Sequence, residues 1–223
     1  MLFLAFSLVL VFAIYGLRTV GDPSAYVQLD FYHKLMMGWT ILLGYMLYYG
    51  KPGSGLDFDG NLSPQAIFGS IAALVALILI SLFAVPMAQV PASLFYVPRL
   101  QLGPWFGGIV DEFCKQFFIV AHGEEVMRIA PALIFSMILK GTRLAKVRVD
   151  IGGFDLGRGD ILMSGAIPSA FWAWFHSIKA YFDPSLLPAI FLAGMILFIL
   201  TVKTRCILAA ILTHAIYNTL ALA

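Results

Sequence analysis

The stretch His122-Gly123-Glu124-Glu125-Val126-Met127-Arg128 places two carboxylates and a guanidinium inside an apolar run from Phe117 to Leu139. A charge near the centre of a bilayer costs from about 2.5 kcal/mol to well over 10 kcal/mol, depending on the system. Ionisable residues in membrane helices therefore face a bundle interior or an aqueous cavity, where they have polar partners. The stretch predicts a functional site within a bundle of membrane helices.

The composition supports a membrane location. Of 223 residues, 61% are hydrophobic and only 12% are charged, whereas about a quarter of the residues of a soluble domain are charged. The net charge of +2 and the lack of a basic run with interleaved aromatic residues argue against a nucleic-acid partner. Two cysteines, Cys114 and Cys206, exclude a cysteine-rich metal site. We therefore expect an integral, multi-pass membrane protein in contact with the lipid bilayer.

Apolar stretches of about 20 residues, the length that crosses a bilayer, divide the chain into about seven predicted transmembrane helices. They cover residues 2–20, 35–49, 66–90, 117–139, 161–182, 187–202 and 207–222. A segment rich in Pro and Gly at 91–108 is predicted to be interfacial or re-entrant. The predicted fold class is all-α and polytopic: residues 1–110 form N-terminal helices and the interfacial segment, and residues 111–223 form the functional core.

The loop at 141–160 is basic and carries a strand pattern. Its basic residues, with the one that precedes it, are Lys140, Arg143, Lys146, Arg148 and Arg158. Val147, Val149 and Ile151 alternate with charged residues before Gly152-Gly153, which favours a short β-hairpin. Because cytoplasmic loops are enriched in Lys and Arg, the N-terminus and the 141–160 loop are predicted to lie in the cytoplasm. An odd number of spans then leaves the C-terminus outside.

Three predicted helices carry polar residues at similar depths. With a rise of about 1.5 Å per residue, Glu124, His176 and His214 each lie roughly 10 Å or slightly more from the same face of the bundle. This agreement predicts one shared site. The alternative is that each histidine packs singly and hydrogen-bonds the backbone of a neighbouring helix.

Within the charged stretch, helix geometry brings both carboxylates near Arg128. Glu124 is four residues away and Glu125 three, and both spacings share a helix face. If Arg128 neutralises one carboxylate, the other is suited to act as a general base for water in a desolvated cavity. The alternative is a buried ion pair that only fixes helix register, and this alternative leaves the second glutamate unpaired.

On the last predicted helix, His214 and Asn218 also lie four residues apart and present two hydrogen-bond donors to one point. Such a pair can stabilise the oxyanion that forms when water attacks a carbonyl. His176 follows Trp172-Ala173-Trp174-Phe175 and could orient the water or share its proton.

In their order and helix placement, these residues resemble the CPBP superfamily, which includes type II CAAX prenyl endopeptidases and bacteriocin-processing and immunity proteins. That family has Glu-Glu-x-x-x-Arg, Phe-x-x-x-His and His-x-x-x-Asn motifs on the first, second and fourth helices of a four-helix core. The matching residues here are Glu124, Glu125, Arg128, Trp172, His176, His214 and Asn218. The resemblance implies that Glu124 is the base, assisted by His176 and supported by Glu125 and Arg128. It implies that His214 and Asn218 form the oxyanion hole.

The chain departs from the family pattern at two points. Trp172 replaces the usual Phe, and two residues rather than three separate Glu125 from Arg128. If register is counted back from Arg128, Gly123 takes the base position, and then Glu125 is the free carboxylate or the site is inert. Two-residue spacing also resembles the PrsW-type proteases, with Glu-Glu-x-x-Lys, and the Aph scaffold subunit of gamma-secretase, which is not itself the protease.

The resemblance implies an intramembrane endopeptidase that uses glutamate-activated water on a membrane-embedded or lipidated substrate, a prenylated CAAX protein in some family members. It implies that no cofactor is required, although Glu124, His176 and His214 are a set that could bind zinc. The alternative is a non-catalytic Aph-like scaffold or bacteriocin-immunity-type protein that binds partner transmembrane helices. A transporter is a third reading, but the sequence shows no inverted repeats or paired broken helices to favour it.

Overall fold

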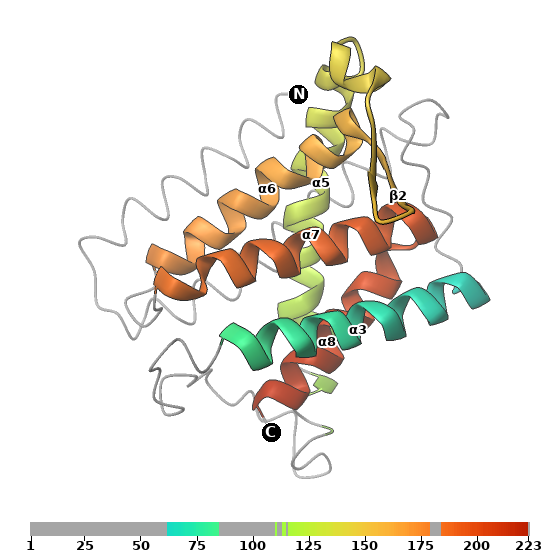
Figure 1. Ribbon diagram of the computed structural model, residues 1–223. Helices are drawn as coiled ribbons and strands as arrows, with labels where there is room; N and C mark the ends of the chain where they lie inside the picture. The colour runs from blue at the N-terminus through green and yellow to red at the C-terminus, as the bar shows by residue number, and fades with distance from the viewer. Residues whose placement is uncertain (1–61, 85–109, 111–112, 115, 179–183, 223) are drawn as a thin grey trace.

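The computed structural model describes residues 62–84, 110, 113–114, 116–178 and 184–222 (Figure 1). These residues form five α-helices, one π-helix, two short 3-10 helices and one two-stranded sheet. The predicted spans at 2–20 and 35–49 and the interfacial segment at 91–108 lie outside the described residues. The mostly helical structure agrees with the predicted fold class, and the number of spans stays a prediction.

The helices follow the predicted apolar stretches closely. They are α3 (Pro64–Ala84), the π-helix η3 (Gln116–Ala121), α5 (His122–Leu139), α6 (Gly159–Ile178), α7 (Leu187–Thr204) and α8 (Ile207–Leu222). Ser63 caps the first of these, because its hydroxyl accepts a hydrogen bond from the Ala66 N–H at 3.2 Å and so satisfies a donor that the helix leaves open. Arg205, with a φ of 55°, ends α7 in the left-handed conformation that is common after helices.

Among the described residues, two segments are long and apolar enough to cross a membrane. They are Pro64–Ala84 and Pro184–Thr204, the second of which joins the short 3-10 helix η5 (Pro184–Leu186) to α7. Apolar side chains project outward from α3, where Phe68 is 73% and Phe83 is 77% exposed. Such a surface suits contact with lipid chains rather than water.

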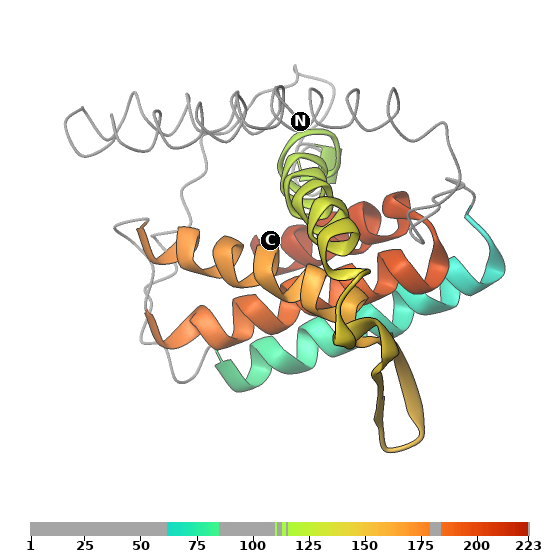
Figure 2. The ribbon, with the colours of Figure 1, turned by 90° about the horizontal axis from the view of Figure 1, so that it is seen from above.

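The helices pack in a sequence that brings distant parts of the chain together. α6 packs against α5 and α7, α3 packs against α7 and α8, and η3 packs against α8. In Figure 2, α6, α7 and α3 run side by side, and α5, which is seen almost along its axis, lies at a steep angle to them. Small residues permit this packing, since Gly165 of α6 lies against the Phe198 ring of α7 and Gly69 of α3 lies against Leu200. Close helix contacts through small residues are typical of membrane bundles.

A β-hairpin between α5 and α6 confirms the strand prediction. β1 (Arg148–Ile151) pairs antiparallel with β2 (Phe154–Arg158). The turn uses Gly152 and Gly153 at φ values of +61° and +84°, a conformation that glycine adopts without strain. The hairpin projects from the helices and exposes 76% of Phe154 at its tip.

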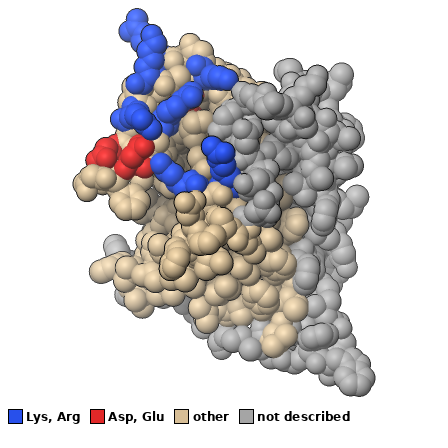
Figure 3. Space-filling view, turned by 90° about the vertical axis from the view of Figure 1, so that its right-hand side faces the viewer, with Lys and Arg blue, Asp and Glu red and all other residues tan. Residues whose placement is uncertain are grey.

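Basic side chains gather over one end of the molecule, around the hairpin (Figure 3). We call this surface the basic end; its exposed members are Lys140, Arg143, Lys146, Arg148, Lys203 and Arg205. Lys203 belongs to α7 and lies 4.0 Å from Asp155 of the hairpin. The basic end therefore combines the predicted basic loop with the end of a helix more than forty residues further along the chain.

Candidate active site

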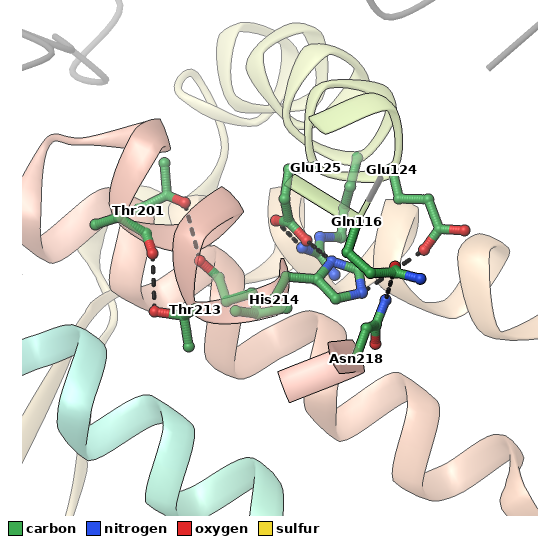
Figure 4. A network of polar contacts seen from close by, with 10 residues as sticks. Gln116, Glu124, Glu125, Thr201, Thr213, His214 and Asn218 are labelled. Carbon is green, nitrogen blue, oxygen red and sulfur yellow. Dashed lines mark hydrogen bonds and ion pairs between the residues drawn. The ribbon is translucent and has the colours of Figure 1, made fainter. Parts of the chain in front are cut away.

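Glu125 is the centre of a buried polar network between α5 and α8 (Figure 4). Its side chain is fully buried, and both carboxylate oxygens have partners. Oε2 accepts from Nη2 of Arg128, three residues along the same helix, and Oε1 lies 2.7 Å from Nδ1 of His214. Because an ionised carboxylate only accepts hydrogen bonds, Nδ1 of His214 is the donor. The contact fixes the orientation of the imidazole.

Glu124 faces the other nitrogen of the same histidine. Its Oε2 lies 3.8 Å from Nε2 of His214, and the residue is 6% exposed. This distance is longer than a direct hydrogen bond, and a separation of this kind is often bridged by a water molecule. His214 therefore stands between two carboxylates, with one ring nitrogen directed at each.

Asn218, one turn beyond His214 on α8, contacts a residue outside the predicted motifs. Its Nδ2 donates to Oε1 of Gln116 at 3.0 Å. Gln116 is only 1% exposed and begins the π-helix η3. The sequence motifs do not include Gln116, which directly precedes the apolar run that begins at Phe117.

Trp172 occupies the position of the family phenylalanine and contacts three site residues. The guanidinium carbon of Arg128 lies 5.1 Å from the ring centroid, within the range of a cation–π interaction. The His176 and His214 rings meet the indole edge-on, at centroid distances of 4.7 Å and 6.0 Å. His176 donates through Nδ1 to the Trp172 carbonyl at 2.8 Å. The indole therefore touches both predicted histidines.

Arg128 also lies close to Gly194 of α7, which in turn lies close to Ser169 of α6. The sequence motifs include neither of these two residues. A Cβ on Gly194 of α7 would lie 3.2 Å from Nη1 of Arg128 and 3.1 Å from Oγ of Ser169. Among the described residues, the Ser169 hydroxyl and Nε and Nη1 of Arg128 have no hydrogen-bond partner. Glycine at 194 leaves the room that the guanidinium occupies.

The predicted site residues are thus partly assembled. Glu124, Glu125, Arg128 and His214 form one network, and His176 joins it through the Trp172 ring. Asn218, one turn from His214 on α8, bonds Gln116 instead. In the described part of the chain no cluster of three His, Cys, Asp or Glu side chains is arranged to hold a metal ion, and zinc binding by Glu124, His176 and His214 stays a prediction. The catalytic roles of the residues remain predictions.

A comparison with protein families supports the resemblance over the second half of this network. Residues 154–220 match a family described as type II CAAX prenyl endopeptidase Rce1-like. The matched range contains Trp172, His176, His214 and Asn218, and it begins after Glu124 and Glu125. No curated protein and no solved structure matches the chain.

Proposed function

From the premise that the chain belongs to the CPBP superfamily of membrane proteases, which the match over residues 154–220 supports, we propose that it is an intramembrane endopeptidase. It hydrolyses a peptide bond of a membrane-associated substrate by glutamate-activated water. The observation that carries the proposal is the placement of His214, which faces Glu125 at 2.7 Å and Glu124 at 3.8 Å.

Glu124 is the proposed base. Both oxygens of Glu125 are engaged, one by Arg128 and one by His214, so Glu125 is suited to hold its neighbours in place. A water between Glu124 and Nε2 of His214 would lie within reach of the carboxylate. Glu124 removes a proton from that water as the oxygen of the water forms a bond to the scissile carbonyl carbon.

His214 and Asn218 are the proposed oxyanion donors. The attack moves the carbonyl π electrons onto oxygen, and donors preorganised for that charge lower the barrier. Because Nδ1 of His214 donates to Glu125, Nε2 is the ring nitrogen that would face the oxyanion, and it would donate there when the ring is protonated on both nitrogens. Glu124 then gives its proton to the departing nitrogen as the C–N bond breaks, which yields a carboxylic acid and an amine.

Trp172 and His176 would complete the substrate side. The indole edge contacts both histidine rings, so it can hold them at a fixed separation. The assisting role that the family implies for His176 requires its ring to reach the water, and in the structure His176 meets the Trp172 ring, which in turn meets the His214 ring. We therefore expect His176→Ala to lower turnover less than Glu124→Gln does.

The substrate is proposed to be a membrane-embedded or lipidated peptide, with prenylated CAAX proteins as one class. The N-terminus and the basic end are proposed to face the cytoplasm, because loops rich in Lys and Arg stay there. Glu124 and Glu125 lie in the first turn of α5, and Lys140 caps the other end. The site would then open on the opposite side of the membrane from the basic end.

Cleavage of membrane peptides by the purified protein in liposomes tests the proposal. The panel contains prenylated and unprenylated peptides, and wild type is compared with Glu124→Gln, each with and without a zinc chelator. We expect wild-type cleavage that resists the chelator and falls at least about 100-fold in Glu124→Gln, since a positioned general base contributes 10²–10⁴-fold. Absence of cleavage by folded wild type across the panel would overturn the proposal and favour a scaffold.

A further inference from the structure

Gln116 is a buried polar residue that the proposed mechanism leaves without a role. It lies on η3, outside all three motifs, and it is 1% exposed. A buried polar side chain costs free energy unless it forms hydrogen bonds. Its contact with Asn218, at 3.0 Å, places it at the edge of the proposed oxyanion hole.

The π-helix accounts for this placement. In a continuous α-helix of 3.6 residues per turn, Gln116 would lie about 80° around the axis from Glu124, eight residues later. A π turn takes up one extra residue, which removes about 100° and brings Gln116 to within about 20° of the face that carries Glu124. Turns of this kind occur frequently at functional sites.

The contact places the NH₂ end of the Asn218 amide beside Oε1 of Gln116. An asparagine amide can rotate to exchange its oxygen and its NH₂ group. Oε1 of Gln116 accepts one of the two protons on Nδ2, which fixes the NH₂ group on this side and leaves the second proton for another acceptor. Glu125 fixes Nδ1 of His214 in a similar way, at 2.7 Å.

We propose that Gln116 is a positioning residue that orients Asn218 as an oxyanion donor. This inference rests on the proposed peptidase function. Each proposed oxyanion donor then also donates to an acceptor that holds it in place: His214 donates to Glu125, and Asn218 donates to Gln116. Gln116 acts through Asn218 and does not itself touch the reacting atoms.

A double-mutant cycle tests this role in the liposome assay. Gln116→Met keeps the length of the side chain and removes the strong acceptor. We expect kcat to fall about 10- to 100-fold, by analogy with the loss caused by removing residues that orient metal ligands. KM should be nearly unchanged. In an Asn218→Ala background the same change should cost less than about twofold, since coupled residues are non-additive.

Two further variants separate this role from a general loss of stability. Thr201→Val removes a different fully buried polar group, a hydroxyl that donates to the Leu197 carbonyl of its own helix at 2.9 Å. This variant should leave kcat unchanged. Gln116→Glu keeps an acceptor toward Asn218 and is the test variant if Gln116→Met does not fold; it should retain more kcat than Asn218→Ala.

The outcomes distinguish this inference from the proposed function. If the wild type cleaves and Gln116→Met has an unchanged kcat, the inference alone is overturned. The same holds if Gln116→Met lowers kcat as much in the Asn218→Ala background as in the wild type. A Gln116→Glu variant that is folded and no more active than Asn218→Ala also overturns the inference alone. No cleavage by wild type overturns the proposed function, and the inference falls with it.

Discussion

Arg128 makes three contacts that belong to different helices. It pairs with Glu125 of α5, lies over the Trp172 ring of α6 and rests against Gly194 of α7. It is 2% exposed, so its charge depends on these neighbours rather than on water. At this scale, the two adjacent glutamates have different surroundings and should respond differently to the same substitution.

We predict that Glu125→Gln destabilises the fold, whereas Glu124→Gln mainly removes activity. A glutamine at 125 would remove the carboxylate that pairs directly with Arg128 and turn an NH₂ donor toward either Arg128 or Nδ1–H of His214. Breaking a buried ion pair from one side costs about 3–5 kcal/mol. Thermal unfolding in detergent should show a clear drop in Tm for Glu125→Gln only. Equal Tm values would show that the ion pair is not required for stability.

Trp172 offers a second prediction at the scale of single residues. Trp172→Phe, the residue typical of the family, retains an aromatic face for Arg128 and should keep turnover within a few-fold of wild type. Trp172→Leu loses the cation–π contact, worth about 0.5–2 kcal/mol, and the edge contacts to both histidines. We expect a loss of about tenfold or more in kcat/KM in the liposome assay. Full activity in Trp172→Leu would show that activity does not depend on the indole ring.

Among the helices, the contact between α6 and α7 determines where Trp172 and His176 lie. We predict that Gly165→Ala destabilises this contact, because the added methyl would overlap the Phe198 ring and overpacking costs about 1–3 kcal/mol. Gly141→Ala is the matched control, since nothing lies within 4 Å of the added Cβ. Unfolding midpoints in detergent compare the two. A larger loss in Gly141→Ala would contradict the packing described.

The helices could be predicted from the sequence, but their rotation could not. Apolar runs predicted α8 at its observed bounds and α7 to within two residues, because length and hydropathy decide where a chain crosses lipid. α7 is apolar nearly all round, so no polar stripe shows which of its faces turns inward, and on α8 only His214 and Asn218 mark a face. The choice of Glu125 as the direct partner of His214, and the π turn that buries Gln116, both depend on rotation.

At the scale of the whole molecule, the hairpin of the basic end and His176 of the candidate site lie at opposite ends of α6. α6 has 20 residues, or about 30 Å at 1.5 Å per residue, comparable with the bilayer core. Phe154 marks the end beside the hairpin, and Ser185 follows the far end of α6. Both residues are exposed, so single cysteines there can report the side of the membrane.

We predict that Phe154→Cys reacts with a membrane-impermeant maleimide only after cells are permeabilised, whereas Ser185→Cys reacts in intact cells. Both are made in a background in which Cys114 and Cys206 are replaced by alanine, and that background is the unlabelled control. The expectation follows from the retention of basic segments in the cytoplasm. The reverse pattern would place the site on the cytoplasmic side, where prenylated proteins are found.

The spacing of the site along the chain also sets a time order during synthesis. Glu125 and Arg128 pair within one helix, whereas His214 follows Glu125 by 89 residues. At about 5–20 residues per second, the ribosome needs roughly 4–18 s to make that interval. Over those seconds Arg128 of the nascent α5 already pairs with Glu125, whereas the His214 imidazole and the Asn218 amide have not yet been made. Under the proposed peptidase function, hydrolysis of membrane substrates would begin only after α8 has joined the bundle.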